Sequence, residues 1–190
     1  MFYKLAQDKK YSDVWYNSKV KHFESVKCPK YSGHQRGIRN VQPLSAEIKK
    51  PDFGDFITTS YSDWLITDKV VDIFQSSNLT GYKRRLVDVC NMRLDFNLWE
   101  IIVTGSAGRA HPDTEIFIKR NCEYCGHIVY SPIKKGKGLI INEAHWDGSD
   151  FFTITEFSKF VLVTENAKKI IEENNLKGAL FVPINELGWE

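Results

Sequence analysis

The sequence lacks the features that would assign it to several large classes of protein. It contains no apolar run as long as a membrane span, and its charged first ten residues lack the apolar core of a secretion signal. It also lacks an excess of charge of one sign: 26 Lys and Arg residues face 24 Asp and Glu residues, which leaves a formal net charge of +2. Nucleic-acid-binding domains normally carry a marked basic excess. We therefore expect a cytoplasmic protein whose partner is neither a membrane nor a nucleic acid.

Cysteine is scarce, but its placement is informative. The four cysteines are Cys28, Cys90, Cys122 and Cys125. In a reducing compartment, such cysteines are more often free thiols or metal ligands than a disulfide framework. The hydrophobic fraction of 42% is enough for an ordinary packed core, so we expect residues 1–190 to form a single domain.

An internal repeat is the strongest positive feature of the chain. Residues 65–81 align without a gap with residues 162–178, at a constant offset of 97 positions, and six of the seventeen aligned residues are identical. A repeat of this kind predicts a duplicated architecture. We expect two pseudo-repeats, at about residues 28–90 and 122–187, with a hairpin connection over residues 96–121.

Each copy of the repeat is predicted to form a strand, a helix and a second strand. Thr67 and Thr164 are plausible N-caps, and each is followed by an acid in the first helical turn. The apolar residues that follow recur at helical spacing, so each helix has one apolar face to bury. Asn78 and Asn175 suit the left-handed position just after a helix. The pattern predicts surface helices packed on a sheet.

The predicted fold class is α+β, with two tandem related strand-helix-strand units joined by β-hairpins and helices packed on a mainly antiparallel sheet. One long hairpin is expected between residues 98–104 and 115–119. A second is expected between residues 128–130 and 139–141, around a basic turn. The first 27 residues show no pattern that defines an element.

A cysteine turn stands at the head of each copy. The second turn, Cys122-Glu-Tyr-Cys125-Gly126, has the form of a zinc knuckle. In a zinc knuckle a tight turn directs two thiolates at one ion, and glycine permits the backbone conformation needed after the second cysteine. The first copy has Cys28 in a similar turn, but Tyr31 stands where the second cysteine is expected. One knuckle supplies only half of a tetrahedral site.

A complete zinc site would combine Cys28, Cys122 and Cys125 with a fourth ligand. His34 is the nearest choice in the sequence, with His127 and Cys90 as further choices. The alternative is that an ancestral site has been lost and the cysteines are small buried apolar groups. A redox role for the C-x-x-C is a third reading, although the motif does not open a helix that would lower a thiol pKa.

Other motifs point to structure and not to catalysis. Residues 105–108 contain two glycines but match neither a phosphate-binding loop nor a nucleophile elbow, so we expect a flexible hairpin turn. The His111-Pro112-Asp113 segment has no nucleophile or second histidine nearby in the sequence. Residues 51–56 and 146–151 are matching segments of acids, glycine and aromatics, for which we expect turn and capping roles with the phenylalanines in the core. We therefore predict that the protein is not an enzyme.

Together these motifs resemble the double-CXXCG motif immunity proteins of bacterial toxin systems. The shared features are a cysteine turn in each half, the Trp-Asp-Gly-Ser-Asp-Phe segment at residues 146–151, and Asn-Leu-x-Gly after each helix. The resemblance covers residues 28–187 and implies stoichiometric binding and neutralisation of a cognate toxin. Tyr31 departs from the family pattern and bears on the metal site. The competing hypothesis is a zinc-ribbon nucleic-acid-binding or transcription accessory protein, which would need a basic face with interleaved aromatics.

Overall fold

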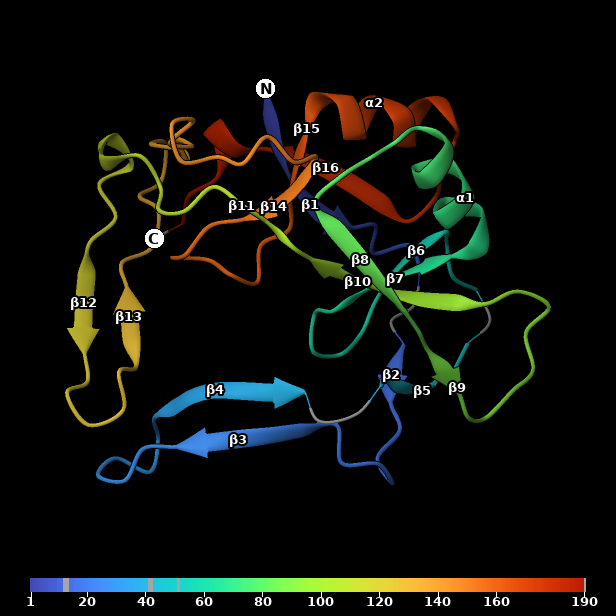
Figure 1. Ribbon diagram of the computed structural model, residues 1–190, viewed down its shortest axis with the longest axis horizontal. Helices are drawn as coiled ribbons and strands as arrows, with labels where there is room; N and C mark the ends of the chain where they lie inside the picture. Colours follow the sequence, from blue (N-terminus) through green and yellow to red (C-terminus); the bar gives the residue numbers. More distant parts are fainter. Residues whose placement is uncertain (12–13, 41–42, 51, 190) are drawn as a thin grey trace.

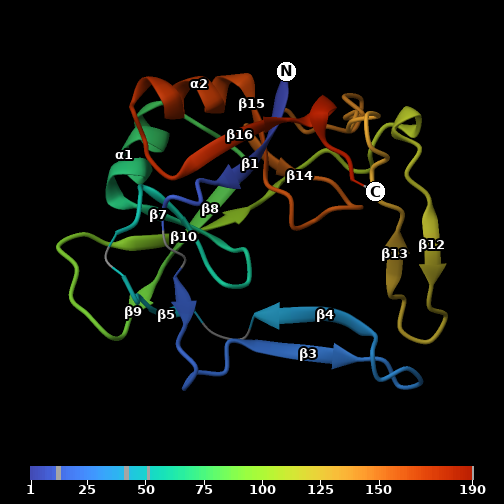
Figure 2. The same ribbon diagram turned by 180° about the vertical axis from the view of Figure 1, so that it is seen from behind.

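Two α-helices lie side by side over two β-sheets, and two β-hairpins extend from this body (Figures 1 and 2). The computed structural model describes residues 1–11, 14–40, 43–50 and 52–189. The elements in chain order are β1 (Phe2–Gln7), β2 (Trp15–Tyr16), β3 (Phe23–Lys27), β4 (Gln35–Asn40), β5 (Ser45–Glu47), β6 (Phe56–Thr58), β7 (Trp64–Thr67), α1 (Asp68–Ser76), β8 (Tyr82–Leu86), β9 (Asp88–Val89), β10 (Leu98–Val103), β11 (Gly105–Ser106), η1 (Pro112–Thr114), β12 (Ile118–Asn121), β13 (Ile128–Tyr130), β14 (Phe151–Thr153), β15 (Leu162–Thr164), α2 (Glu165–Glu173), β16 (Ala179–Pro183) and η2 (Ile184–Glu186). The fold is α+β, as predicted. None of the helices in the described ranges is long and apolar enough to cross a bilayer.

The strands form two larger sheets and three small ones. The first large sheet has the order β6-β7-β10-β8 and is antiparallel throughout. The second has the order β11-β14-β15-β1-β16 and is antiparallel except for the β11–β14 pair. The small sheets are β2-β5-β9 and the hairpins β3–β4 and β12–β13.

Strand β1 has the same position in the second sheet as β10 has in the first. β10 lies between β7 and β8, with Trp99 opposite Ile66. β1 lies between β15 and β16, with Tyr3 opposite Val163, the repeat counterpart of Ile66. This arrangement was not predictable from the repeat, because the strand between β15 and β16 comes from the N-terminus and lies outside the aligned residues.

Strands β10 and β1 also contact the helices in the same way. The Trp99 indole N–H donates to Asp68 Oδ1 at 2.6 Å, and the Tyr3 hydroxyl donates to Glu165 Oε2 at 2.5 Å. Asp68 and Glu165 are the first residues of α1 and α2. Each helix start is therefore fixed to β10 or β1 by an aromatic side chain with a polar tip.

Both helices bury one apolar face in a shared central core, as the sequence pattern predicted. Burial of a large apolar side chain contributes about 1.5–3 kcal/mol, so this face accounts for much of the packing energy of each helix. Two further hydrophobic cores are formed by buried residues of other strands and of the loops that connect them. The buried residues of the central core include Tyr3, Phe56, Trp64, Ile66, Val70, Val71, Phe74, Leu79, Ile101, Phe151, Val163, Ala167, Ile171 and Leu176.

The helix ends agree with the sequence prediction at most positions. Thr164 accepts a hydrogen bond from the Ala167 N–H at 3.2 Å, whereas Thr67 occupies the N-cap position without a side-chain cap bond. Asn78 and Asn175 both adopt the left-handed conformation, with φ of 54° and 52°. The short polar side chain of Asn tolerates this conformation better than most residues.

The segments that precede β6 and β14 join the two halves reciprocally. Asp55 accepts from the backbone N–H of Lys177 at 2.8 Å, and Asp150 accepts from the backbone N–H of Thr80 at 3.0 Å. Thr80 and Lys177 are repeat counterparts, so each aspartate binds the loop after the other half's helix. Phe56 and Phe151 are fully buried in the central core. Asp55 and Asp150 thus bind the loops that follow the helices, and Asp147 accepts from the Ser149 N–H in a turn; Pro51 lies outside the described residues.

Both predicted hairpins are wrong. β10 pairs with β7 and β8 and not with residues 115–119, while β12 pairs with β13 around the second cysteine turn. Residues 139–141 contribute only an isolated bridge between Ile141 and Ala110. Residues 105–108 do not form a free turn, because β11 pairs in parallel with β14. Strand-like composition indicated where extended segments occur but not which segments pair.

Candidate metal centre

Each of the two projecting hairpins ends in a cysteine turn. In the β3–β4 hairpin the Cys28 N–H donates to the His34 carbonyl at 3.0 Å, and in the β12–β13 hairpin the Cys122 N–H donates to the His127 carbonyl at 2.9 Å. Gly126, which closes the second turn, has a φ of 67°, a conformation that glycine adopts without strain. The two turns therefore present their cysteines in the same way, at the tip of a hairpin.

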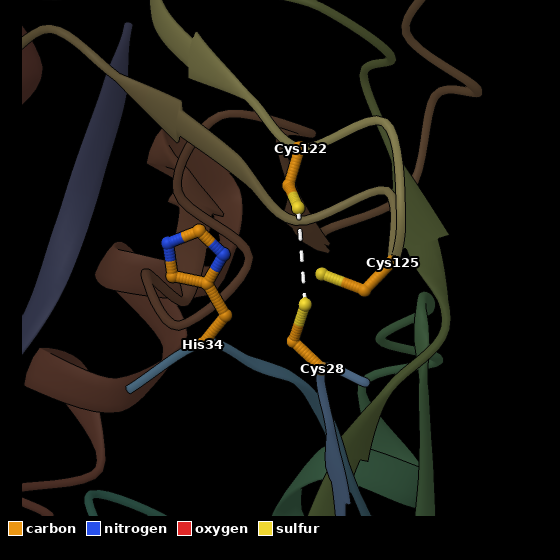
Figure 3. A group of neighbouring side chains, drawn as sticks. All are labelled: Cys28, His34, Cys122 and Cys125. Atoms are coloured by element: carbon orange, nitrogen blue, oxygen red, sulfur yellow. Dashed lines mark hydrogen bonds between the residues drawn. The ribbon is translucent and has the colours of Figure 1, made fainter. Parts of the chain in front are cut away.

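The two hairpin tips meet and bring four predicted ligands together. Single ligand atoms of Cys28, His34, Cys122 and Cys125 all lie within 4.8 Å of one another (Figure 3). The Sγ atoms of Cys28 and Cys122 are 3.9 Å apart, and the three cysteines are 4–6% exposed. These are the four residues that the sequence combined into one site, with His34 and not His127 or Cys90 in the fourth position.

His34 directs an unpartnered nitrogen at the thiols. Nδ1, the ring nitrogen bonded to Cγ, faces the sulfur atoms in Figure 3. It is buried without a hydrogen-bond partner. Burying a polar atom in this state costs about 1–3 kcal/mol. A metal ion bound by Nδ1 and the three sulfurs would remove that cost.

Backbone donors and neighbouring thiols affect the cysteines differently. Burial opposes ionisation of Cys28, but the backbone N–H groups of Lys30 and Tyr31, with the adjacent thiols, outweigh it, so the pKa of Cys28 lies below its ordinary value. Burial raises the pKa of Cys125, and the neighbouring thiols raise it further against the backbone N–H of His127. A cation among the sulfurs would stabilise the thiolate form of neighbouring cysteines.

Tyr31 replaces the missing cysteine without entering the cluster. Its side chain is 47% exposed, and its backbone N–H donates to Cys28 Sγ at 3.3 Å. This N–H would support a thiolate whatever side chain residue 31 carries. The aromatic ring packs against His34, at 5.0 Å between ring centroids. The first turn thus contributes one sulfur and one imidazole where the second contributes two sulfurs.

The other two ligand choices lie outside the cluster. The ring centroid of His127 is 5.2 Å from that of His34, so His127 packs beside the ligand histidine. Cys90 is exposed and its Sγ contacts the Ala46 carbonyl at 3.4 Å in another sheet. The His111-Pro112-Asp113 segment has a structural role: the His111 side chain accepts from the Asp113 N–H at the start of η1.

The donor set fits zinc. Three thiolates and one imidazole form a common structural zinc site, and soft sulfur ligands favour zinc over magnesium, calcium or manganese. Four protein ligands complete a tetrahedron and leave no position for a substrate. A site with four protein ligands is typical of structural zinc.

The residues around the cluster were not predicted from the sequence. Lys30 and Arg120 lie two positions from Cys28 and Cys122, and together with Tyr31 and Tyr124 they line a surface hollow beside the ligands. The signal was available, since each of these residues lies next to a cysteine turn. It could not be interpreted without knowing that the two turns meet.

A scan against protein-family models finds no match, and a search of curated proteins finds none either. The cluster and the sequence resemblance are therefore the basis for a functional assignment.

Proposed function

We propose that this protein is an immunity protein that binds a cognate toxin domain stoichiometrically and neutralises it in the cytoplasm, without acting as an enzyme. The observation that most directly supports this proposal is that two separate cysteine turns bring four ligand residues together. These residues are Cys28, His34, Cys122 and Cys125. It gives a spatial reason for the paired turns on which the resemblance to double-CXXCG immunity proteins rests.

The cluster is proposed to hold a structural zinc ion. Cys28 and His34 hold it from the β3–β4 hairpin, and Cys122 and Cys125 hold it from the β12–β13 hairpin. The ion fixes the relative position of two hairpins that are each only two strands wide, and an isolated two-stranded hairpin is marginally stable in water. We call the β3–β4 and β12–β13 hairpins the two arms of the protein. The role of zinc is therefore to make the two arms one rigid surface for a partner.

The body that carries the arms is proposed to be a duplicated scaffold. The matching positions of β10 and β1, the matching Asn residues after the helices and the reciprocal aspartate contacts support this proposal. In this interpretation the second unit is completed by the N-terminal strand, so the units extend beyond residues 28–90 and 122–187. The duplicated parts serve folding, and the arms serve recognition.

Co-expression tests the function. The product of the gene adjacent to this one, carrying an inactivating substitution in its toxin domain, should co-purify with the protein at a one-to-one ratio. The active toxin should arrest growth of cells that lack this protein and spare cells that express it. If the adjacent product neither co-purifies nor is toxic, the immunity function is wrong.

Elemental analysis tests the metal independently. Protein purified without chelators should contain about one equivalent of zinc per chain. A matched variant, Cys90→Ser, should retain the zinc, because Cys90 lies outside the cluster. A zinc content below about a tenth of an equivalent in the wild type would exclude a high-affinity site.

A further inference from the structure

A surface hollow lies directly beside the metal cluster, at the point where the hairpin tips meet. Tyr31 and Tyr124, with 47% and 51% of their side chains exposed, stand close together on its wall, with ring centroids 6.1 Å apart. The hollow is lined by Lys30, Tyr31, His34, Arg120, Asn121, Cys122, Glu123 and Tyr124. It exists only when both hairpins are in place.

Two hydrogen-bond donors face each other at this hollow when a metal is bound. Metal coordination through Nδ1 of His34 leaves the ring proton on Nε2, and Nε2 lies 3.4 Å from Nη1 of Arg120. A guanidinium group has no acceptor, so this pair cannot form a hydrogen bond in that state. A ligand histidine normally donates its second N–H to a carboxylate, a carbonyl or water. The acceptor that would satisfy both groups has to come from elsewhere.

The chain itself does not provide that acceptor within its described ranges. Glu123 is the one carboxylate that lines the hollow, and it is exposed and makes no hydrogen bond with His34 or Arg120. Lys30 adds a third donor. Its Nζ donates to the Tyr124 hydroxyl at 2.6 Å and lies 4.2 Å from the centroid of the Tyr124 ring. The hollow thus combines cationic donors with aromatic walls.

The sequence segments that form the arms are basic, although the protein as a whole is nearly neutral. Residues 23–40 contain four Lys and Arg residues and one Glu, and residues 118–130 contain two Lys and Arg residues and one Glu, whereas the whole chain has a net charge of +2. The rest of the chain is therefore net acidic. A basic segment of chain attracts and orients an acidic partner.

Exposed apolar side chains on the β12–β13 arm favour a protein over a nucleic acid as that partner. Phe117, Ile118 and Ile128 are 55%, 45% and 39% exposed. Aliphatic side chains contribute to protein interfaces, whereas single-stranded nucleic acids are held mainly by stacking on aromatic and arginine side chains.

We infer that this hollow is the docking site for a carboxylate on an acidic surface of the partner protein, held by Arg120, Lys30 and the Nε2–H of His34 between Tyr31 and Tyr124. The inference rests on the proposed function, in which the partner is the toxin domain. Beyond that function, the inference specifies the face of this protein that binds the toxin domain and the chemical group that this face recognises.

The test measures binding of the inactivated toxin domain from the adjacent gene by calorimetry at 0.1 M and 0.5 M NaCl. The variant Lys30→Glu/Arg120→Glu should bind at least about tenfold more weakly at the lower salt concentration, because each reversal places a like charge against the partner's carboxylate. The control variant Lys9→Glu/Lys83→Glu changes the net charge equally at exposed positions on the body. It should bind within about threefold of the wild type, because its reversals lie away from the hollow. Both variants should keep the wild-type zinc content, which shows that the arms remain assembled.

Each outcome has one meaning. Selective weakening of Lys30→Glu/Arg120→Glu supports the docking site. Equal weakening of both variants, or of neither, overturns it while leaving the immunity function intact. If the wild type does not bind the toxin domain at all, both proposals are wrong. Binding of a fluorescein-labelled 30-nucleotide RNA that is lost in Lys30→Glu/Arg120→Glu, with toxin binding unchanged, also overturns the docking site and favours a nucleic-acid ligand.

Discussion

Cys28 and Cys122 are separated by 94 positions in the sequence, yet their Sγ atoms lie 3.9 Å apart at the junction of two hairpins. Cys28 lies before α1, in the β3–β4 hairpin, whereas Cys122 lies between β12 and β13. The stability of the arms should depend on what holds these sulfurs together.

Metal removal should loosen the arms and leave the body folded. Chelation of zinc should speed hydrogen exchange at residues 28–34 and 122–127, while β7 and β10 keep wild-type protection, because the body has its own core. The free energy of unfolding should fall by about 3 kcal/mol or more, the linkage expected for a ligand present at a hundredfold excess over its dissociation constant. Uniform loss of protection would contradict this division.

A cysteine at position 31 should compensate for loss of His34. His34→Ala should lose most of the bound zinc, because only three sulfur ligands remain. Tyr31→Cys/His34→Ala should regain it, since position 31 corresponds to Cys125 in the second turn. Tyr31→Phe/His34→Ala is the matched control and should stay depleted. Zinc content by mass spectrometry gives the answer, and full retention in His34→Ala alone would show that His34 is not a ligand.

Metal-free protein should form a specific disulfide between the arms. Diamide removes two electrons and two protons from a pair of thiols, and the Cys28 and Cys122 sulfurs need only a small approach to bond. Peptide mapping without reduction should identify the Cys28–Cys122 cross-link, and bound zinc should suppress it. A predominant Cys122–Cys125 product would disprove the expected pairing.

Gly81 and Gly178 should not tolerate a side chain. Their φ values are 85° and 94°, and a Cβ at either site would overlap a backbone carbonyl of the other half, that of Phe151 or Phe56. Gly81→Ala and Gly178→Ala should each lower the free energy of unfolding by about 3 kcal/mol or more, the range of overpacking combined with backbone strain. Gly136→Ala is the matched control: its φ is 76° but its Cβ would meet open space, so only about 1 kcal/mol should be lost. Urea unfolding measures all three.

Asp68 should make stability depend on pH in the acidic range. The backbone N–H of Asn97 at 2.7 Å, followed by the Trp99 indole, lowers the pKa of Asp68 below the ordinary 3.8. Since the folded state binds the proton less tightly than the unfolded state, the stabilisation is complete above about pH 4 and is lost as the pH falls through the folded-state pKa. Asp68→Asn should remove this part of the acid dependence in urea unfolding from pH 7 to pH 2.5. Asp72→Asn, exposed on the same helix, is the matched control.

Local features of the fold were predictable because short-range interactions fix them. Asn78 and Asn175 marked the helix ends, since the left-handed conformation depends on the residue itself and its nearest neighbours. The helical faces were visible as spacing in the sequence for the same reason. Strand pairing was not predictable, because alternation and β-propensity say that a segment is extended but not which edge it joins.

The candidate site was predictable in its ligands but not in its surroundings. Cysteine spacing and the proximity of His34 indicated the four residues that the structure brings together. The contact between Arg120 and His34 depends on two hairpins meeting, and no local pattern records it. The hollow that these residues line is a property of that junction.

The sequence by itself determined the repeat, the helices with their ends, and the cysteine turns. The helices and the turns were predictable because each depends on residues that are close together in the sequence. Only the tertiary structure decided that β1 completes the second sheet, that each aspartate binds the opposite half, and that the cysteine turns meet at one point. Those outcomes depend on long-range packing, in which the free energy of burying a shared core selects among pairings that local sequence leaves equal.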